Sequence, residues 1–313
     1  MRVLTSALIS LVMLGSGCDS GAVGVEQVEE RMLGLNDIVL QGPGVVLQGP
    51  GVVLQGPGVV LQGTTFYATV SKNGVTYNLS GMDFVGAEFD LRLTAIVNGQ
   101  QMVQDVVIRI NSITPSPKYP DVLQYDLTYR EKNSAAWKPY CGDSNVQAVP
   151  LNSYWDVETG DRIDDPNVVT FGCANAVLAK CTLWGYRPWA TATQCDPKDK
   201  KNKGKNCGPI SLQDHHQACT RMARADYCGT GKPATMDGTL IDIWDRLSPP
   251  LQTKFTDWEL EAEWTTEGAN CLNFVRHPEL GYPSCFLKKG KKVGQCGKKP
   301  LSNSLTFNAF DAP

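Results

Sequence analysis

Two neighbouring histidines and the thiols near them are the residues of this chain best suited to chemistry. His215 and His216 are followed by Cys219, Asp226 and Cys228. A thiol beside an imidazole that an acid orients is the arrangement of a cysteine nucleophile. The same stretch raises the hypothesis of a hydrolase with its site near His215, His216 and Asp226.

Two groups of residues resemble parts of metal sites. His215 and Cys219 are four residues apart, which suits metal ligation from one helix face, but no third or fourth ligand is evident. Asp237, Asp242 and Asp245 surround a turn without the spacing of an EF-hand loop. We therefore predict no metal and no cofactor, and we expect the three acids to be exposed.

The chain has eleven cysteines, of which Cys18 stands apart from the other ten. An even set confined to one region of an exported chain predicts a disulfide framework, without specifying how the thiols pair. Zinc is disfavoured because no Cys-x-x-Cys pair is present. The ten disulfide candidates are Cys141, Cys173, Cys181, Cys195, Cys207, Cys219, Cys228, Cys271, Cys285 and Cys296.

Residues 1–17 have the layout of a signal peptide: Met1-Arg2, an apolar run and small residues. The run is too short to cross a bilayer. A cysteine after small residues resembles the bacterial lipobox, although Gly15 stands where that pattern favours leucine. We expect lipidation of Cys18, with residues 18–37 as a lipid-anchored tether. The alternative is a plain exported protein in which Cys18 is incidental.

Residues 38–63 hold three perfect copies of Gln-Gly-Pro-Gly-Val-Val-Leu, beginning at Gln41, Gln48 and Gln55. Gly-Pro-Gly in every copy excludes a helix. A period of seven would swap the faces of a continuous strand, so each Val-Val-Leu is predicted to be a short extended piece. We interpret the segment as a semi-extended stalk rather than a packed β unit.

Residues 64–131 predict an antiparallel β domain. Apolar and polar residues alternate on both sides of Asn73-Gly74 and of Asn98-Gly99, which indicates two β-hairpins. Residues 123–129 add another strand. The domain has neither His nor Cys and offers little for catalysis, and we expect a small sandwich or barrel.

Two helices are expected to position the residues that suggest chemistry. Residues 174–180 predict the first, with Cys181 near its end. Ser211, with an acid three residues later, predicts the start of a second helix that continues to about Ala225. On this helix Cys219 lies on the apolar stripe and is expected to face the core.

The tetrapeptide Ala225-Asp226-Tyr227-Cys228 resembles the ADYC domain, a family named for these four residues and found in bacterial surface lipoproteins. Asp237-Gly238 beyond it predicts a tight hairpin turn. The resemblance covers roughly residues 135–290 and rests on segments 137–142, 173–189, 219–245 and 261–271. It implies a surface lipoprotein and no particular reaction.

Charged and aromatic side chains suggest what the protein binds. The net charge of −3 does not favour nucleic acid as a partner. Lys201, Lys203 and Lys205 lie in a basic run that suits an anionic polysaccharide or lipid headgroups, with a solvated loop as the alternative. Trp184 and Trp189 suit a glycan site, although packing around disulfides explains them equally well.

These features predict a mainly β, α+β fold: a small antiparallel β domain, followed by a disulfide-rich α+β domain over residues 132–313. They predict an exported protein of the cell envelope, lipid-anchored at the outer membrane or surface of a Gram-negative bacterium. The expected role is non-catalytic, either binding or structural. Expected partners are the membrane, through Cys18, and envelope polysaccharide or another surface protein. The alternatives are an envelope hydrolase and a purely structural spacer.

Overall fold

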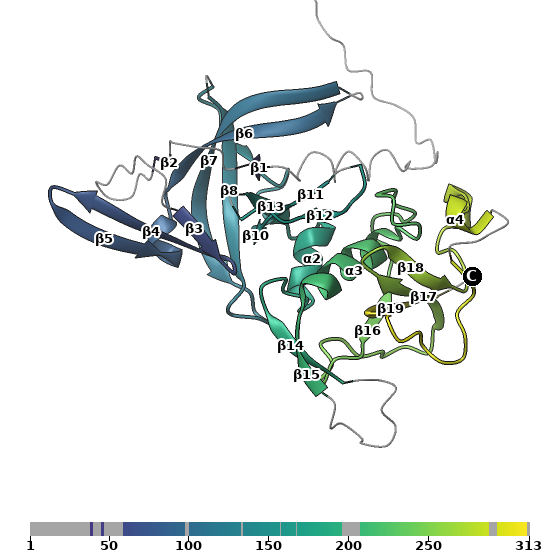
Figure 1. Ribbon diagram of the computed structural model, residues 1–313. Helices are drawn as coiled ribbons and strands as arrows, with labels where there is room; N and C mark the ends of the chain where they lie inside the picture. The colour runs from purple at the N-terminus through teal and green to yellow at the C-terminus, as the bar shows by residue number, and fades with distance from the viewer. Residues whose placement is uncertain are drawn as a thin grey trace, which may run out of the picture.

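A computed structural model describes residues 38–39, 45–46, 59–97, 100–132, 134–156, 158–166, 168–195, 207–287 and 293–311 (Figure 1). Up to Cys173 the elements are β1 (Ile38–Val39), β2 (Val45–Val46), β3 (Val59–Gln62), β4 (Thr65–Lys72), β5 (Val75–Ser80), η1 (Gly81–Phe84), β6 (Glu88–Val97), β7 (Gln100–Pro115), β8 (Leu123–Glu131), β9 (Lys138–Pro139), β10 (Ala148–Asn152), β11 (Tyr154–Trp155), β12 (Arg162–Ile163) and β13 (Val169–Cys173). Beyond it lie α2 (Val177–Leu183), β14 (Thr191–Cys195), β15 (Cys207–Ser211), α3 (Gln213–Arg224), β16 (Asp242–Asp245), β17 (Glu259–Thr265), β18 (Gly268–Leu272), η2 (Pro278–Leu280), α4 (Ser284–Leu287) and β19 (Thr306–Phe310). The protein is therefore mostly β with antiparallel sheets, and its helices follow the first β part, as the fold class predicts.

The largest sheet has eight strands in the order β1-β6-β7-β8-β10-β13, with β2 also on β6 and β9 also on β8. β6 and β7 form the second predicted hairpin, from Glu88↔Arg109 to Val97↔Gln100. The sheet continues past residue 131, where we place the end of the β domain, because Ala148 of β10 pairs with Tyr125 of β8. The exact domain limits stay predictions.

A three-stranded sheet, β3-β4-β5, packs against this large sheet. Its β4–β5 turn is the predicted Asn73-Gly74, whose φ angles of 52° and 77° suit a two-residue hairpin. The two sheets share one aromatic core, in which the ring of Phe66 on β4 lies 5.6 Å from Tyr125 and 5.9 Å from Phe171. This arrangement is the sandwich that the alternating pattern indicates.

The described parts of the repeat pair with strands of both sheets. Ile38 of β1 pairs with Leu93, and Val45 of β2 pairs with Phe89. These two positions are seven residues apart, yet their partners are only four apart, so the described pieces β1 and β2 are separate short extended pieces, as predicted. The last unit, β3, lies in a sheet against β4. The stalk itself stays a prediction, because residues 40–44 and 47–58 lie outside the described part.

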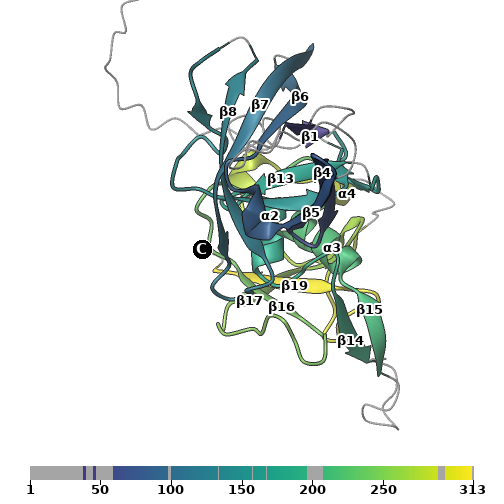
Figure 2. The ribbon, with the colours of Figure 1, turned by 90° about the vertical axis from the view of Figure 1, so that its left-hand side faces the viewer.

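The two longer helices lie between the large sheet and a four-stranded sheet, β16-β19-β17-β18 (Figures 1 and 2). α2 contacts β13 of the large sheet, and α3 contacts β17, β18 and β19. The second helix matches its prediction closely, whereas α2 begins three residues later than expected and contains Cys181. In the described segments, no helix has the length and apolar character needed to cross a membrane.

Candidate functional site

α3 carries the residues that suggest chemistry, and the fold buries them. His215, His216 and Cys219 are at most 1% exposed. The helix begins one residue later than Ser211 predicts, because Leu212 is its N-cap, and Ser211 Oγ accepts a hydrogen bond from the backbone N–H of Gln213 at 3.2 Å. The apolar stripe of α3, including Ala218 and Met222, packs into the core cluster that also holds Cys219, which confirms the predicted orientation of this cysteine.

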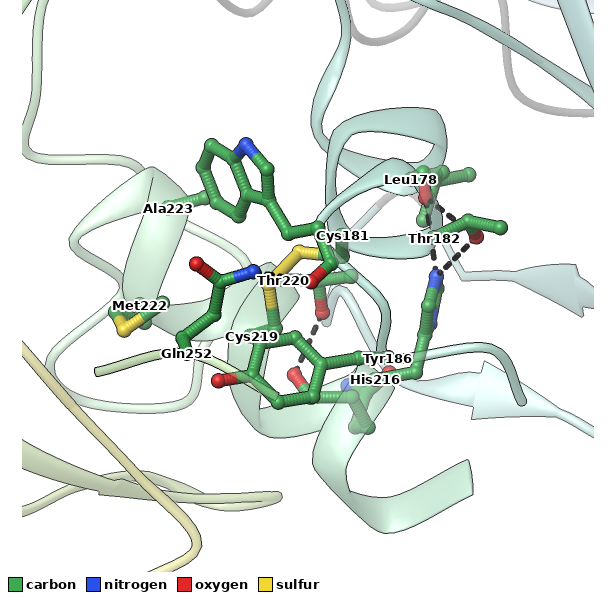
Figure 3. Close-up of a disulfide and its surroundings, with 12 residues drawn as sticks. Leu178, Cys181, Thr182, Tyr186, His216, Cys219, Thr220, Met222, Ala223 and Gln252 are labelled. Atoms are coloured by element: carbon green, nitrogen blue, oxygen red, sulfur yellow. Dashed lines mark hydrogen bonds between the residues drawn. A yellow bond between two sulfur atoms is a disulfide. The ribbon is translucent and has the colours of Figure 1, made fainter. Parts of the chain in front are cut away.

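His216 connects α3 to α2. Its Nε2 lies 3.0 Å from the carbonyl oxygen of Leu178 and 3.3 Å from Thr182 Oγ1 (Figure 3). Burial lowers the pKa of His216 to about 4, so the ring is neutral at pH 7 and donates from Nε2 to the carbonyl. This histidine acts as an interhelical hydrogen-bond donor.

His215 points into a different part of the core. Its ring stacks on Tyr186 with centroids 6.2 Å apart, and neither ring nitrogen has a hydrogen-bond partner among the described residues. Burial lowers the pKa of His215 to about 4. A general base must come within hydrogen-bond reach of a substrate proton, and a side chain that is 1% exposed cannot do so in this conformation.

Five disulfides use all ten predicted cysteines. Cys181–Cys219 joins α2 to α3, next to the histidine contacts (Figure 3). The others are Cys141–Cys173, Cys195–Cys207, Cys228–Cys285 and Cys271–Cys296. Because the sulfurs at positions 219 and 228 are bonded to other sulfurs, neither supplies the thiolate that a cysteine nucleophile requires.

One group of possible metal ligands occurs in the described part of the chain: Glu263, Cys271 and Cys296, with ligand atoms within 4.8 Å of one another. The two sulfurs are joined in a disulfide. Glu263 Oε2 accepts hydrogen bonds from the backbone N–H of Leu301 at 2.9 Å and the hydroxyl of Ser304 at 2.6 Å. These atoms therefore stabilise the chain rather than offering an open metal site.

The residues Ala225 and Asp226 turn the chain out of α3. Ala225 has φ 53°, the left-handed conformation that ends many helices. Asp226 is fully buried, and its Oδ2 lies 2.5 Å from Arg221 Nη1. Its carboxylate also accepts hydrogen bonds from the backbone N–H groups of Thr230 and Gly231, both at 2.9 Å. Asp226 thus ties the helix and the turn together through Arg221 and two backbone N–H groups, and not through either histidine of α3.

Tyr227 forms hydrogen bonds with β17 and with the loop that follows β18. Its hydroxyl donates to Glu261 Oε1 at 2.8 Å and accepts from the backbone N–H of Arg276 at 2.9 Å. Burial, followed by the charge of Glu261, raises the pKa of Tyr227 well above its usual value. Glu261 and Arg276 form a buried ion pair at 3.0 Å, and the guanidinium also donates to the carbonyl of Met222 near the end of α3.

Cys228 and Gly229 complete the turn. Cys228 bonds to Cys285 of α4. Gly229 has φ 62°, and a Cβ at this position would lie 1.9 Å from the carbonyl oxygen of Glu267 in the β17–β18 turn. Only glycine permits so close an approach of two backbones. Each residue of the tetrapeptide and the glycine after it therefore has a structural contact.

Asp242 and Asp245 are buried, so our expectation of exposed acids is wrong for these two and holds for Asp237 alone. Asp242 Oδ2 accepts from the backbone N–H and hydroxyl of Thr256 at 2.8 and 2.6 Å. Asp245 accepts from the backbone N–H groups of residues 247, 251 and 252 and from the hydroxyl of Tyr186. The loop after β16 folds back over the strand and supplies all of these donors except the hydroxyl of Tyr186, which follows α2. Neither contact has a local sequence signal.

The turn at Asp237-Gly238 is present, but it is not a hairpin. Gly238 has φ 83°, and the backbone N–H of Thr239 donates to the carbonyl of Met236 at 3.3 Å. No strand precedes this turn within residues 212–241, which the structure describes in full. β16, which follows the turn, pairs with β19 instead.

The two candidate ligand-binding tryptophans are half-buried and pack against core clusters. Trp184 contacts the cluster around Cys181 and Cys219. Trp189 lies over Gly63, where a Cβ would be 3.1 Å from the indole Nε1. Lys201, Lys203 and Lys205 fall outside the described residues, in the segment that links β14 to β15. The structure therefore brings the two tryptophans into packing contacts, and the proposed polysaccharide site stays a prediction.

Comparison with known proteins identifies one family. The model of the ADYC domain matches residues 81–278, which includes most of the large sheet, both longer helices and the tetrapeptide after α3. No curated protein and no solved structure matches the chain.

Proposed function

Because this chain belongs to the ADYC domain family, we propose that it is an exported lipoprotein of the bacterial cell envelope, held on the membrane by an acylated Cys18. The observation that carries the proposal is the pairing of ten cysteines into five disulfides, which is consistent with export, because such bonds persist in oxidising compartments. Cys18 follows a signal-like segment and is left over from this even set.

The role that fits the α3 core is structural. Its histidines, Asp226 and Tyr227 are buried and contact neighbouring elements. These residues therefore hold the fold together and leave ligand contact to the surface of the protein. We propose that this surface binds envelope polysaccharide or another surface protein. Lys201, Lys203 and Lys205 supply the positive charge that an anionic polysaccharide requires.

Metabolic labelling with palmitate tests the anchor. The full chain, expressed in a Gram-negative host, should incorporate the label and fractionate with membranes, whereas Cys18→Ser should be unlabelled and recovered in the soluble exported fraction. Ser20→Ala is the matched control and should keep the label. An unlabelled wild-type protein, or a Cys18→Ser variant that retains label, would contradict lipidation at this residue.

Co-sedimentation with an insoluble anionic envelope polysaccharide tests the partner. Replacing Lys201, Lys203 and Lys205 by alanine should raise the apparent dissociation constant severalfold and weaken its dependence on salt. The control replaces the exposed Lys118, Lys132 and Lys138, which removes the same charge elsewhere. If the two triple variants lose the same affinity, binding depends only on the total charge of the protein, and the proposed site is contradicted.

A further inference from the structure

A hydroxyl, an imidazole and a carboxylate lie in series at a place far from α3. Thr239 Oγ1 lies 2.8 Å from His277 Nε2, and His277 Nδ1 lies 2.8 Å from Glu279 Oε1. A hydroxyl within hydrogen-bond reach of a base, with that base oriented by an acid on its other nitrogen, is the arrangement that activates a hydroxyl nucleophile.

Two short backbone features hold these side chains. Thr239 closes the turn that begins at Met236, so its hydroxyl is fixed at the entrance to β16. His277 immediately precedes η2, and Glu279 lies in the single turn of that helix. Pro278 between them restricts the backbone and keeps the carboxylate beside the imidazole. Thr239 and His277 are 38 residues apart, so only the fold brings them together.

The protonation pattern suits proton transfer. Hydrogen bonds from its own backbone N–H and then from His277 lower the pKa of Glu279, so the carboxylate is ionised. An ionised Glu279 favours the tautomer of His277 that carries its proton on Nδ1, which leaves a lone pair on Nε2. The hydroxyl of Thr239 has this nitrogen and the carbonyl of Met236, also at 2.8 Å, as alternative acceptors.

Exposed apolar side chains flank the three residues in sequence. Leu240, directly after Thr239, is 74% exposed, and Tyr282, three residues after Glu279, is 60% exposed. His277 itself is 12% exposed at its side chain, against 56% for Glu279. The imidazole is therefore largely desolvated while part of it still reaches solvent, and its ring lies 5.9 Å from that of Phe310, an apolar neighbour that suits a hydrocarbon chain.

We propose that Thr239, His277 and Glu279 form a hydrolytic site for esters with an apolar acyl group. Thr239 is the nucleophile, His277 the general base and Glu279 a positioning residue. This site goes beyond the anchoring and binding role proposed above, and it lies apart from the residues of α3.

The reaction takes place in two steps. Thr239 Oγ bonds to the acyl carbon while its proton passes to His277 Nε2; the bond from that carbon to the alcohol oxygen then breaks, and the alcohol leaves with the proton. Water next attacks the acyl–threonine ester, giving one proton to Nε2, and Thr239 Oγ takes that proton back as the acid leaves. The sum is ester plus water giving acid plus alcohol.

The test uses the full chain, p-nitrophenyl butyrate as substrate and a fluorophosphonate as covalent probe. Wild type should hydrolyse the ester, and its probe adduct should map to Thr239 by peptide mass spectrometry. Thr239→Val, which keeps the shape and removes the hydroxyl, should lower hydrolysis to background and lose the adduct, whereas Thr239→Ser should retain both. His277→Gln should lower kcat about 100-fold.

The positioning role of Glu279 has its own readout. Glu279→Gln should lower kcat at least about tenfold and leave KM unchanged, since the residue acts only through the imidazole. Matched controls are Thr76→Val on β5 and Glu267→Gln in the β17–β18 turn, both exposed and both expected to leave hydrolysis unchanged. An intact mass that shows five disulfides verifies the fold of each variant.

Three results would overturn the proposal: wild-type hydrolysis no faster than that of Thr239→Val, a probe adduct at another residue, or a Thr239→Ser variant that folds but neither hydrolyses nor labels. None of these results bears on palmitate incorporation at Cys18. The hydrolytic site and the proposed anchor therefore fail or stand independently.

Discussion

At the scale of single residues, Asp226 and Glu261 show how this core holds buried charge. Moving an ionised carboxylate out of water costs several kcal/mol unless partners replace its hydration. Asp226 receives the guanidinium of Arg221 and two backbone N–H groups. Glu261 receives Arg276, the hydroxyl of Tyr227 and the amide of Asn308. The second and third residues of the tetrapeptide are thus each tied to one of two buried ion pairs.

Removing the hydroxyl of Tyr227 should therefore destabilise the protein. In Tyr227→Phe the ring can still stack on Trp264, 5.4 Å away, but Glu261 Oε1 and the backbone N–H of Arg276 lose a partner. We expect the free energy of unfolding to fall by about 1–3 kcal/mol in urea titrations. Tyr282→Phe, at an exposed tyrosine, is the control and should change it by less than about 0.5 kcal/mol. Equal effects would contradict this role of the hydroxyl.

Stability should also decrease in mild acid because of His215 and His216. Burial lowers both pKa values to about 4, so between pH 4 and 6.5 the unfolded chain binds protons that the folded protein does not. The contribution of each neutral ring is complete above pH 6.5 and is lost as the pH falls toward 4, by up to about 1.4 kcal/mol per pH unit.

Urea titrations at several pH values check this dependence. His215→Phe keeps an aromatic ring and removes the titration, and no described hydrogen bond is lost because neither ring nitrogen has a partner. Its slope of stability against pH should be shallower than that of wild type by about the contribution of one histidine. Identical slopes would show that His215 is not buried as a neutral ring.

At the scale of elements, the sequence predicts those helices and hairpins whose signals lie within one stretch of chain, and it carries no signal for contacts between distant segments. The Asn73-Gly74 hairpin and α3 follow from alternation, turn residues and an N-terminal serine, all within one stretch of chain. Burial of Asp242 depends on Thr256, and the Thr239–His277 contact spans 38 residues. No periodic pattern encodes such contacts, so sequence reasoning did not bring Thr239 and His277 together.

Disulfide connectivity belongs to the same scale. Cys181–Cys219 joins two helices, with both sulfurs fully buried and 38 residues of sequence between its ends. Cys195–Cys207 spans 12 residues and joins opposite positions of the β14–β15 hairpin. Ten cysteines in sequence predicted bridges without revealing this difference.

The two bridges should therefore differ in what they contribute to stability. Replacing Cys181 and Cys219 together by alanine should cost about 2–5 kcal/mol, at least about 1 kcal/mol more than the same change at Cys195 and Cys207, because the longer loop restricts the unfolded chain more. Thermal or urea unfolding of both double variants checks the order. A larger loss at the hairpin bridge would contradict it.

At the scale of the whole molecule, the first β part and the disulfide-rich part share a sheet and a core. β10 and β13 extend the large sheet beyond residue 131, and Phe171 of β13 packs against Phe66 of β4. The change in composition near residue 131 is real, since all ten paired cysteines lie beyond it. Composition reports where residues of a kind gather, whereas strand pairing decides which segments fold together.

This shared core predicts that the two parts unfold as one unit. All seven tryptophans lie after residue 131, so intrinsic fluorescence reports only on the disulfide-rich part. Phe66→Ala, a change in the first part at a fully buried ring, should lower stability by about 3–5 kcal/mol and shift the fluorescence-detected urea midpoint to lower concentration. Val75→Ala, at the exposed end of β5, is the control and should leave that midpoint in place. If the Phe66→Ala midpoint also stays while circular dichroism shows an earlier loss of strand, the parts unfold separately, and the boundary in composition is a boundary in folding as well.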